Sequence, residues 1–201
     1  MSDTVAVEPS SPAIASGRLF IVSAPSGAGK TTLCDALRSR FGDLAYSISY
    51  TTRSPRRGER DGKDYFFISQ EAFEQGIAEG RWAEWARVHG YLYGTSAEWI
   101  AQTLAQGKDI LMDIDVQGTR QLLQRFPQAV TIFIRPPSIE TLEKRLRQRG
   151  ADDAATIAIR LKNARSEMDQ QNIYRHVLIN EDLDKAKREF IAIIESYRLP
   201  T

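Results

Sequence analysis

The 201-residue chain contains a single cysteine, Cys34, so no disulfide can form within it, and a reducing compartment is expected. Its 27 basic and 26 acidic residues leave a net charge of +1, so no field of one sign favours a nucleic-acid or membrane partner. No apolar run approaches the ~20 residues that cross a bilayer. The first sixteen residues lack lysine and arginine, and therefore lack the basic start of a signal peptide. These absences predict a cytoplasmic protein with neither a nucleic-acid nor a membrane partner.

Residues 1–16 are rich in serine, proline and alanine, which predicts a disordered tail, and residues 17–201 are expected to form one domain. Within that domain, short apolar runs alternate with helical patterns in the segments 17–44, 107–137 and 166–201. Buried strands that alternate with helices form parallel sheets covered on both faces, so we predict an α/β core. The expected strands are 19–23, 110–115, 130–134 and 177–179. The expected helices are 30–41, 119–125, 139–149, 156–171 and 183–197.

Residues 45–106 follow a different pattern. Polar and apolar side chains alternate over 46–50 and again over 82–88, and a short helix capped by Ser69 is expected between them. This pattern predicts a small, mainly antiparallel insertion attached to the core. The segment 138–165 is helical in pattern and rich in arginine, and it is predicted to form a helical lid.

A glycine-rich segment follows the first strand and reads Ala24-Pro25-Ser26-Gly27-Ala28-Gly29-Lys30-Thr31. A strand before it and a helix after it are the context that a P-loop requires, although alanine replaces the first glycine of the motif. The glycines allow backbone N–H groups to turn toward phosphates, and the helix N-terminus adds partial positive charge. Lys30 would reach the β- and γ-phosphates, and the Thr31 hydroxyl would bind Mg²⁺. The segment predicts a P-loop NTPase core and an ATP-dependent phosphotransferase.

A carboxylate ends the apolar run of residues 110–113. Many buried strands end in aspartate, but beside a P-loop Asp113 is the expected second protein ligand of Mg²⁺. Asp115 follows it at the carboxyl edge of the sheet, where α/β proteins bind their ligands.

Two arginines in the insertion are candidates for binding the phosphate of the acceptor. Arg53 and Arg56 lie three residues apart, and Pro55 restricts the backbone between them. Guanidinium groups bind phosphate in a bidentate manner, so this pair suits a dianionic phosphate. The alternative is a solvated basic loop.

With these motifs in place, the chain resembles the guanylate kinase family from Gly17 to nearly the C-terminus. The resemblance is carried in order by the blocks SAPSGAGKTTL, SYTTRSPRRGERDGKDYFF, EWARVHGYLYGTS, LMDIDVQG, IFIRPPS and LINEDLD. It implies the transfer of a phosphoryl group from ATP to GMP with Mg²⁺, giving ADP and GDP, in purine nucleotide metabolism and GMP recycling. It also implies that the insertion binds GMP.

The resemblance further implies roles for individual residues. The GMP phosphate would be held by Arg53, Arg56, Tyr65 and Tyr93. The guanine would be surrounded by Ser49, Glu84, Thr95 and Asp115. Catalysis would depend on Lys30 and Arg53, joined by the lid residues Arg145, Arg149 and Arg160, for which solvated helix charges are the alternative. The adenine of ATP would lie near Asn180.

The chemistry of Glu84 favours guanine independently. Guanine presents N1–H and N2–H₂ side by side, and one carboxylate accepts from both, whereas adenine presents an acceptor at N1. A site built on such pairing rejects the wrong base by ~10⁴-fold or more. The alternative is a polar side chain that faces solvent from an alternating strand.

Two other functions remain open. One is a catalytically silent module that binds protein partners, and the intact P-loop lysine and paired arginines argue against it. The other is a related kinase with a ribose bisphosphate acceptor, in which Ser49, Glu84 and Thr95 would have no purpose. Cys34 and the three tryptophans are expected to pack in the core or at hinges, and neither His89 nor His176 is assigned a role.

Overall fold

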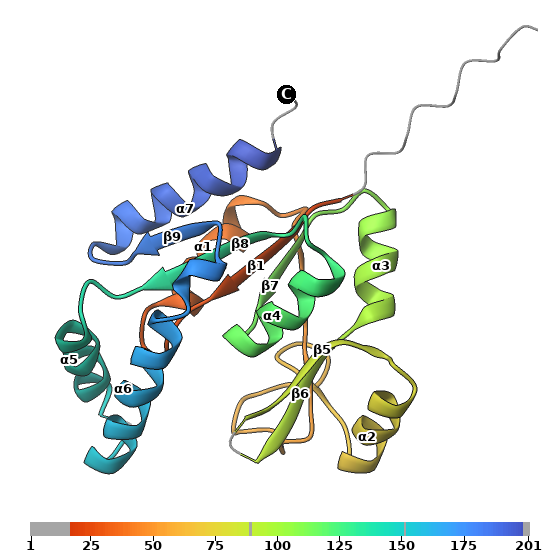
Figure 1. The fold of residues 1–201 in the computed structure, drawn as a ribbon, viewed down its shortest axis with the longest axis horizontal. Coiled ribbons are helices and arrows are strands. Elements are labelled where there is room, and N and C mark those ends of the chain that lie inside the picture. The colour runs from red at the N-terminus through yellow and green to blue at the C-terminus, as the bar shows by residue number, and fades with distance from the viewer. Residues whose placement is uncertain (1–16, 89, 151, 199–201) are drawn as a thin grey trace, which may run out of the picture.

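The computed structural model describes residues 17–88, 90–150 and 152–198. The predicted tail at 1–16 and His89 therefore lie outside the described residues. Figure 1 shows a central sheet with helices on both faces, from which the insertion and the pair α5 (Ile139–Arg149) and α6 (Ala154–Met168) extend separately. Within the described part of the chain, every helix is too short or too polar to cross a membrane.

The central sheet has five strands in the order β2-β7-β1-β8-β9, and all neighbouring pairs are parallel. This confirms the predicted parallel core. The strands are β1 (Leu19–Ser23), β2 (Ala45–Tyr46), β7 (Ile110–Asp113), β8 (Val130–Arg135) and β9 (His176–Ile179). Since β1 is central and buried on both faces, it is a continuous apolar run before its final serine.

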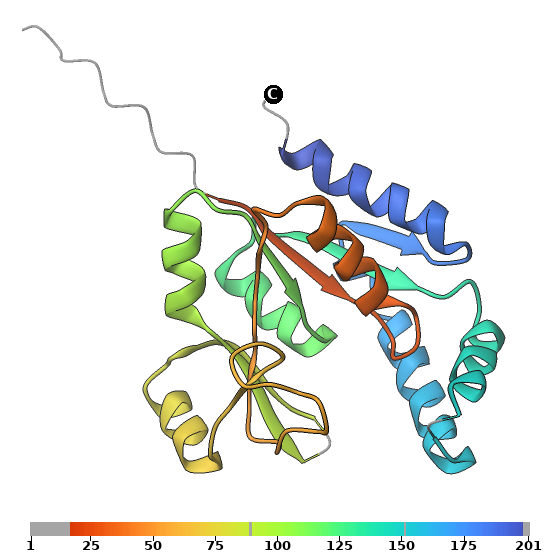
Figure 2. The same cartoon turned by 180° about the vertical axis from the view of Figure 1, so that it is seen from behind.

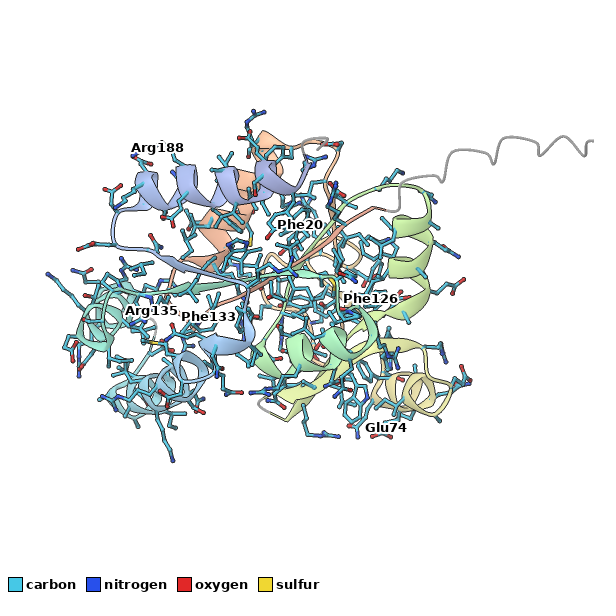
Figure 3. All side chains as sticks on the ribbon, turned by 45° about the horizontal axis from the view of Figure 1, so that its top comes forward. Phe20, Glu74, Phe126, Phe133, Arg135 and Arg188 are labelled. Carbon is cyan, nitrogen blue, oxygen red and sulfur yellow. The ribbon has the colours of Figure 1, made fainter. Side chains whose placement is uncertain are left out.

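Alternate side chains of β1 enter two separate hydrophobic clusters. Phe20 and Val22 pack against α1 (Lys30–Arg40) and α7 (Leu183–Arg198), and Figure 2 shows these helices on one face. Leu19 and Ile21 pack against α3 (Ala97–Ala105) and α4 (Val116–Arg125) on the other. Figure 3 shows Phe20 inside the molecule beneath α7, while Arg188 of the same helix lies on the outside. The period of two along β1 thus assigns its side chains to the two faces.

The small sheet of the insertion has four strands in the order β4-β3-β6-β5. Its pairs β3–β6 and β5–β6 are antiparallel, and β3–β4 is parallel, so the prediction of a mainly antiparallel insertion is confirmed. Helix α2 (Gln70–Ala78) covers it and begins at the predicted cap, where the Ser69 hydroxyl accepts from the Ala72 N–H. The strands are β3 (Tyr50–Thr51), β4 (Phe66–Phe67), β5 (Trp82–Val88) and β6 (Tyr91–Ser96).

The structure draws the boundary of the insertion differently from the prediction of 45–106. Ala45–Tyr46 pairs with β7 in the central sheet, so the strand expected at 46–50 is divided between two sheets. Helix α3 was not predicted, and it packs on the central sheet through Ile100. Strands of two residues are too short to show a period, which is why the alternation alone could not separate β2 from β3.

The segment 138–165 is helical, as expected. It contains α5 (Ile139–Arg149), whose bounds match the prediction, and most of α6 (Ala154–Met168), which ends before the predicted residue 171. A 3₁₀ turn at Gln171–Ile173 follows. The two helices have a hydrophobic cluster of their own, formed by Leu142, Leu146, Ile157, Leu161 and Ala164. Because this cluster is separate from the sheet, the two helices form a distinct unit, called the lid below.

The core packing gives a stability prediction. Phe190 is fully buried between α7 and the sheet, so Phe190→Ala should lower the free energy of unfolding by about 3–5 kcal/mol through lost burial and a residual cavity. Urea unfolding followed by circular dichroism measures this. The matched control is Glu189→Ala at an exposed neighbouring position, which should change the free energy by less than about 0.5 kcal/mol. Equal effects of the two substitutions would contradict the packing described here.

Candidate active site

A cavity of about 540 Å³ lies among the glycine-rich loop, the insertion and the lid. It opens at the carboxyl edge of the central sheet, where parallel α/β sheets bind ligands. The predicted site residues that line it are Ala24, Pro25, Ser26, Gly27, Gly29, Lys30, Thr31, Ser49, Arg53, Arg56, Tyr65, Glu84, Tyr93, Asp113, Asp115, Arg149 and Arg160. Segments far apart in the sequence thus meet around one space.

The glycine-rich loop has the backbone that phosphate binding requires. Gly27 and Gly29 adopt φ angles of 92° and 97°, in the left-handed region that favours glycine. Helix α1 begins immediately after Gly29, which caps it without a side-chain hydrogen bond. The Ala28 N–H already donates to the Pro25 carbonyl at 3.0 Å. The N–H groups of the first turn of α1 are therefore not consumed by a capping side chain and can serve an anion.

Lys30, the first residue of α1, forms an ion pair with Asp113, the last residue of β7. Burial alone would lower the pKa of Lys30, but the Asp113 carboxylate opposes it and the pKa is raised above its ordinary value. Lys30 is therefore a charged ammonium in this structure. Thr31 follows it and is exposed, so its hydroxyl is accessible from the cavity.

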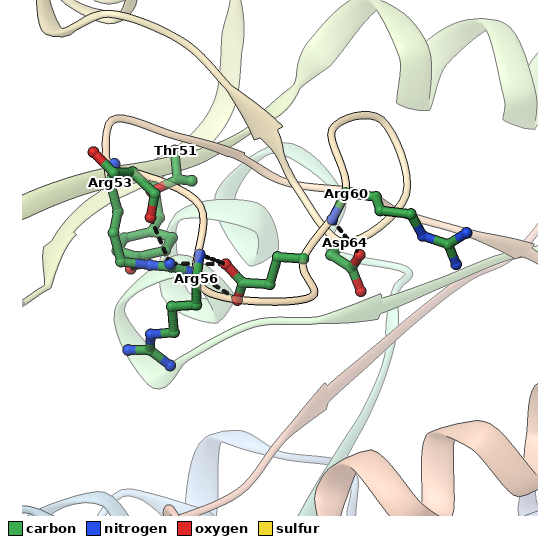
Figure 4. Close-up of polar contacts among 8 residues, drawn as sticks. Thr51, Arg53, Arg56, Arg60 and Asp64 are labelled. Atoms are coloured by element: carbon green, nitrogen blue, oxygen red, sulfur yellow. Dashed lines mark hydrogen bonds and ion pairs between the residues drawn. The ribbon is translucent and has the colours of Figure 1, made fainter.

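The Arg53 guanidinium is held by fixed partners, as Figure 4 shows for its pairing with a carboxylate. Its two Nη atoms donate to the two carboxylate oxygens of Glu59, each at 2.9 Å. Nη1 also donates to the Ser54 carbonyl at 2.8 Å, and Nε donates to the Tyr93 hydroxyl at 3.2 Å. The Glu59 pairing raises the pKa of Arg53 and lowers the pKa of Glu59. Since a guanidinium carries five N–H groups, one N–H of Nη2 remains for a ligand.

Arg56 is held differently. Its backbone N–H donates to Glu59 at 2.7 Å, while its exposed guanidinium is directed away from that carboxylate (Figure 4). Tyr65 and Tyr93 pack edge to face, with ring centroids 5.9 Å apart, and the Arg53 guanidinium lies 5.4 Å from the centre of the Tyr65 ring. The predicted phosphate-binding residues are thus assembled at one place.

Glu84 is buried rather than solvent-facing, with an exposed fraction of 5%. A bulge between Trp82 and Glu84 shifts the register of β5, and Glu84 pairs with Thr95 on β6. The Thr95 hydroxyl donates to Glu84 Oε1 at 2.8 Å. Burial raises the pKa of Glu84 to about 7, the Thr95 hydrogen bond opposes the rise, and the Asp115 charge adds to it. The structure therefore excludes the alternative of a solvated polar residue.

Asp115 caps helix α4. Its Oδ1 accepts from the Gly118 N–H at 2.8 Å, which leaves its other oxygen for a ligand. Ser49 is half-buried between β2 and β3 and lines the same cavity. Of the four residues predicted around guanine, Ser49, Glu84 and Asp115 therefore line the same cavity as the predicted phosphate-binding residues. Thr95 is buried outside the lining and reaches it only through its hydrogen bond to Glu84.

The lid arginines separate into two groups. Arg149 and Arg160 line the cavity, and Arg160 donates to the Ser26 hydroxyl at 3.4 Å while pairing with Asp152 at 3.1 Å. Arg145 does not line it, and its Nη2 donates to the Asn180 carbonyl at 2.8 Å. Asn180 is buried outside the cavity lining, and its Nδ2 donates to the Ala28 carbonyl at 2.8 Å. Asn180 thus holds the glycine-rich loop at Ala28, and Arg145 holds Asn180. The predicted contacts of these two residues with ATP stay predictions.

Two carboxylates in the cavity were missed at the sequence level. Glu59 is the partner of Arg53, and its position three residues after Arg56 in a turn is the signal that could have indicated it. Glu167 lies on α6 and lines the cavity, and burial raises its pKa to about 7 while the charge of Lys30 opposes the rise. No local pattern distinguishes Glu167 from a solvated helix residue.

The oxygen donors beside Lys30 fit a magnesium ion bound together with a nucleotide. Asp113 offers a carboxylate and Thr31 a hydroxyl, both of which are hard ligands. Among the described residues, no group of three His, Cys, Asp or Glu side chains is arranged to hold a metal. Mg²⁺ is usually held by one or two protein oxygens together with waters and phosphate oxygens, and Asp113 and Thr31 are donors of that kind.

Comparisons with known proteins agree with this arrangement. The family model described as guanylate kinase matches residues 16–197. A guanylate kinase of Syntrophotalea carbinolica is 52% identical over 178 residues, which cover 89% of this chain and 85% of that protein. A guanylate kinase of Nitrosospira multiformis is 49% identical over 185 residues, covering 92% and 88%. The crystal structure of guanylate kinase from Anaplasma phagocytophilum superposes with a TM-score of 0.74 at 30% identity, covering 93% of this chain and 89% of that one. The chain therefore belongs to the guanylate kinase family of nucleoside monophosphate kinases.

Proposed function

We propose that the chain transfers the γ-phosphoryl group of ATP to GMP in the cytoplasm, giving ADP and GDP in purine nucleotide metabolism and GMP recycling. One observation carries the proposal. The glycine-rich loop, the Arg53 and Arg56 pair and the buried Glu84 line a single cavity, so donor and acceptor can meet without leaving it. Family membership supports the same reaction.

On the acceptor side, Glu84 would receive hydrogen bonds from N1–H and N2–H₂ of guanine. Its Oε1 is already positioned by Thr95, and the low polarity around it strengthens any hydrogen bond to the carboxylate. Ser49 and Asp115 would complete the contacts to the base. Adenine would place an acceptor against the carboxylate, so the same group would exclude AMP.

The acceptor phosphate would bind between the insertion arginines and the paired tyrosines. Arg53 would contribute the N–H of Nη2 that its protein partners leave available, and Arg56 would contribute its whole guanidinium. Tyr65 and Tyr93 would donate their hydroxyls. Because Arg53 is already held by Glu59, little side-chain entropy is lost when the phosphate binds.

On the donor side, backbone N–H groups at residues 24–31 would bind the phosphates of ATP. Lys30 would exchange Asp113 for the β- and γ-phosphates, and Arg149 and Arg160 would add positive charge from the lid. Arg145 and Asn180 would hold the loop in place, with Asn180 also near the adenine. No covalent intermediate is required, because phosphoryl transfer depends on in-line positioning and charge neutralisation.

Thr31 and Asp113 would hold Mg²⁺. When bound, the ion neutralises charge on the β- and γ-phosphates. The Asp113 carboxylate would become available to the ion once Lys30 turns from it toward the phosphates.

A coupled ADP-release assay over a panel of acceptors tests the proposal against its two competitors. GMP should support turnover, while AMP and a ribose bisphosphate should not. A silent protein-binding module would release no ADP with any acceptor. A ribose bisphosphate kinase would respond to that acceptor alone.

Removal of the positive charge of Lys30 should nearly abolish phosphoryl transfer. Lys30→Met should lower kcat by about 10²- to 10³-fold or more, because the lost charge stabilises the transition state more than the ground state. Steady-state kinetics measures this, with circular dichroism to verify folding. Lys108→Met, at an exposed position outside the cavity lining, is the control and should retain full activity. Activity of Lys30→Met within tenfold of the parent would refute the assignment.

The raised pKa of Glu84 gives a pH prediction. Below pH 7 the carboxyl is mostly protonated, and a protonated oxygen opposes the guanine donors, so kcat/KM for GMP should rise between about pH 6 and pH 8. The GMP phosphate titrates near pH 6, so the same profile is recorded for Glu84→Gln. Glu84→Gln should have a lower kcat/KM for GMP, and the remaining pH dependence of its kcat/KM should come only from the titration of the GMP phosphate. Identical profiles in the two proteins would contradict the base contact.

The same pKa predicts a stability change of known sign. A carboxyl whose folded pKa is raised stabilises the fold when it is protonated, and that contribution is lost as the pH rises through about 7. Glu84→Gln should therefore raise the Tm at pH 8 relative to the parent, and less so at pH 5. Thermal unfolding at the two pH values measures the difference, and a lower Tm at pH 8 would contradict it.

A further inference from the structure

One edge of the insertion's sheet is completed by side chains instead of by a strand. Strand β5 is the outermost strand in the order β4-β3-β6-β5, and helix α4 of the core lies against it. Gln121 of α4 accepts from the Trp85 N–H through Oε1 at 3.1 Å and donates to the Trp85 carbonyl through Nε2 at 2.8 Å. A residue of a neighbouring antiparallel strand exchanges the same two bonds. The Gln121 amide thus substitutes for the missing strand at one position.

A second contact holds β5 on the other side of Glu84. Arg125, one turn further along α4, donates from Nη1 to the Trp82 carbonyl at 3.0 Å. Between these two anchored residues, the bulge shifts the register of β5 and Glu84 turns into the cavity. The backbone that carries the base-recognition carboxylate is therefore fixed to the core at both flanks.

Helix α4 also lies close to the Glu84 carboxylate itself, at Gly118. Gly118 lies one turn before Gln121 on the same face of α4, and a Cβ built on it would lie 2.6 Å from Glu84 Oε2 and 3.2 Å from its Cδ. No real Cβ approaches another atom this closely, so glycine is what allows the carboxylate its present position. The φ angle of Gly118 is not in the positive region, so alanine fits the helix backbone and would disturb only the neighbouring groups.

We propose that Gly118, Gln121 and Arg125 are positioning residues that determine base specificity by fixing Glu84 against helix α4. The inference rests on the proposed function, in which Glu84 reads guanine. The same helix presents Asp115 at its N-terminus, so both carboxylates that face the base are aligned by α4. Helix α4 of the core would in this way fix the position of Glu84, the residue of the insertion that recognises guanine.

The test uses two variants that act by different means. Gly118→Ala pushes on the carboxylate, and Gln121→Met keeps the side-chain length but removes both bonds to Trp85. Each should raise KM for GMP by about tenfold, the size expected for a displaced hydrogen-bonding group, while kcat and KM for ATP stay within about twofold. The preference for GMP over IMP, which lacks the 2-amino group, should also fall. Gln124→Met, at an exposed position on α4, is the control and should match the parent.

A double-mutant cycle separates positioning from general stabilisation. If Gln121 acts through Glu84, Gln121→Met should have no further effect on KM for GMP in the Glu84→Ala background. Additive effects of the two substitutions, or equal losses in kcat and in both KM values with a lowered Tm, would overturn the proposal. So would an unchanged KM for GMP in both Gly118→Ala and Gln121→Met.

Failure of the proposed function gives a different result. If the parent protein releases no ADP with GMP, or if Glu84→Ala uses GMP as well as the parent, the function or the base contact is wrong. If the parent uses GMP and Glu84→Ala impairs it while the α4 variants behave normally, only the present inference is wrong.

Discussion

The site depends first on the parallel pairing of β1 with β7. In this register Val22 lies beside Asp113, so the loop that follows β1 begins next to the carboxylate that ends β7. Parallel strands end at the same edge of a sheet, and this brings the Lys30 cation and the Asp113 anion together from positions more than eighty residues apart. The pairing is secured by side chains buried on both faces of the sheet, in two separate hydrophobic clusters. Core packing thus fixes the position of the glycine-rich loop relative to Asp113.

Three of the cations that line the cavity have carboxylate partners within the protein. Lys30 pairs with Asp113, Arg53 pairs with Glu59, and Arg160 pairs with Asp152. Arg53 is the most buried of the three cations, and without a partner it would lose hydration with no compensation, whereas Arg160 stays more than a third exposed. Binding of phosphates then exchanges one anionic partner for another. For Arg53 the exchange is partial, because Glu59 occupies both Nη atoms and one Nη2 N–H is left.

Much of the fold and the site followed from local patterns. The run Leu19–Ser23, the glycine-rich loop after it and the bounds of α5 were predictable because strand burial, glycine conformation and helical period are short-range properties. The division of 46–50 between two sheets was not predictable, since it depends on which distant strand each residue pair meets. The role of Glu59 was missed for a related reason. Its significance arises only when Arg53 folds back on it, which composition does not reveal.

Helix α4 connects the part of the cavity formed by the core with the part formed by the insertion. Near its N-terminus, the Thr119 hydroxyl donates to the Asp115 carbonyl at 2.9 Å, and its lone pairs remain for the Ser23 hydroxyl at 3.0 Å and the Tyr174 hydroxyl at 3.2 Å. Ser23 is the last residue of β1 before the glycine-rich loop, so these buried bonds tie the start of α4 to the start of that loop. Along its length, the same helix contacts β5, which carries Glu84. A rigid helix of ten residues spans only about 15 Å, so a displacement of one end of α4 also displaces the groups bound to its other end. In-line transfer tolerates little misplacement, and the buried hydroxyl bonds and the β5 contacts both act on this one helix.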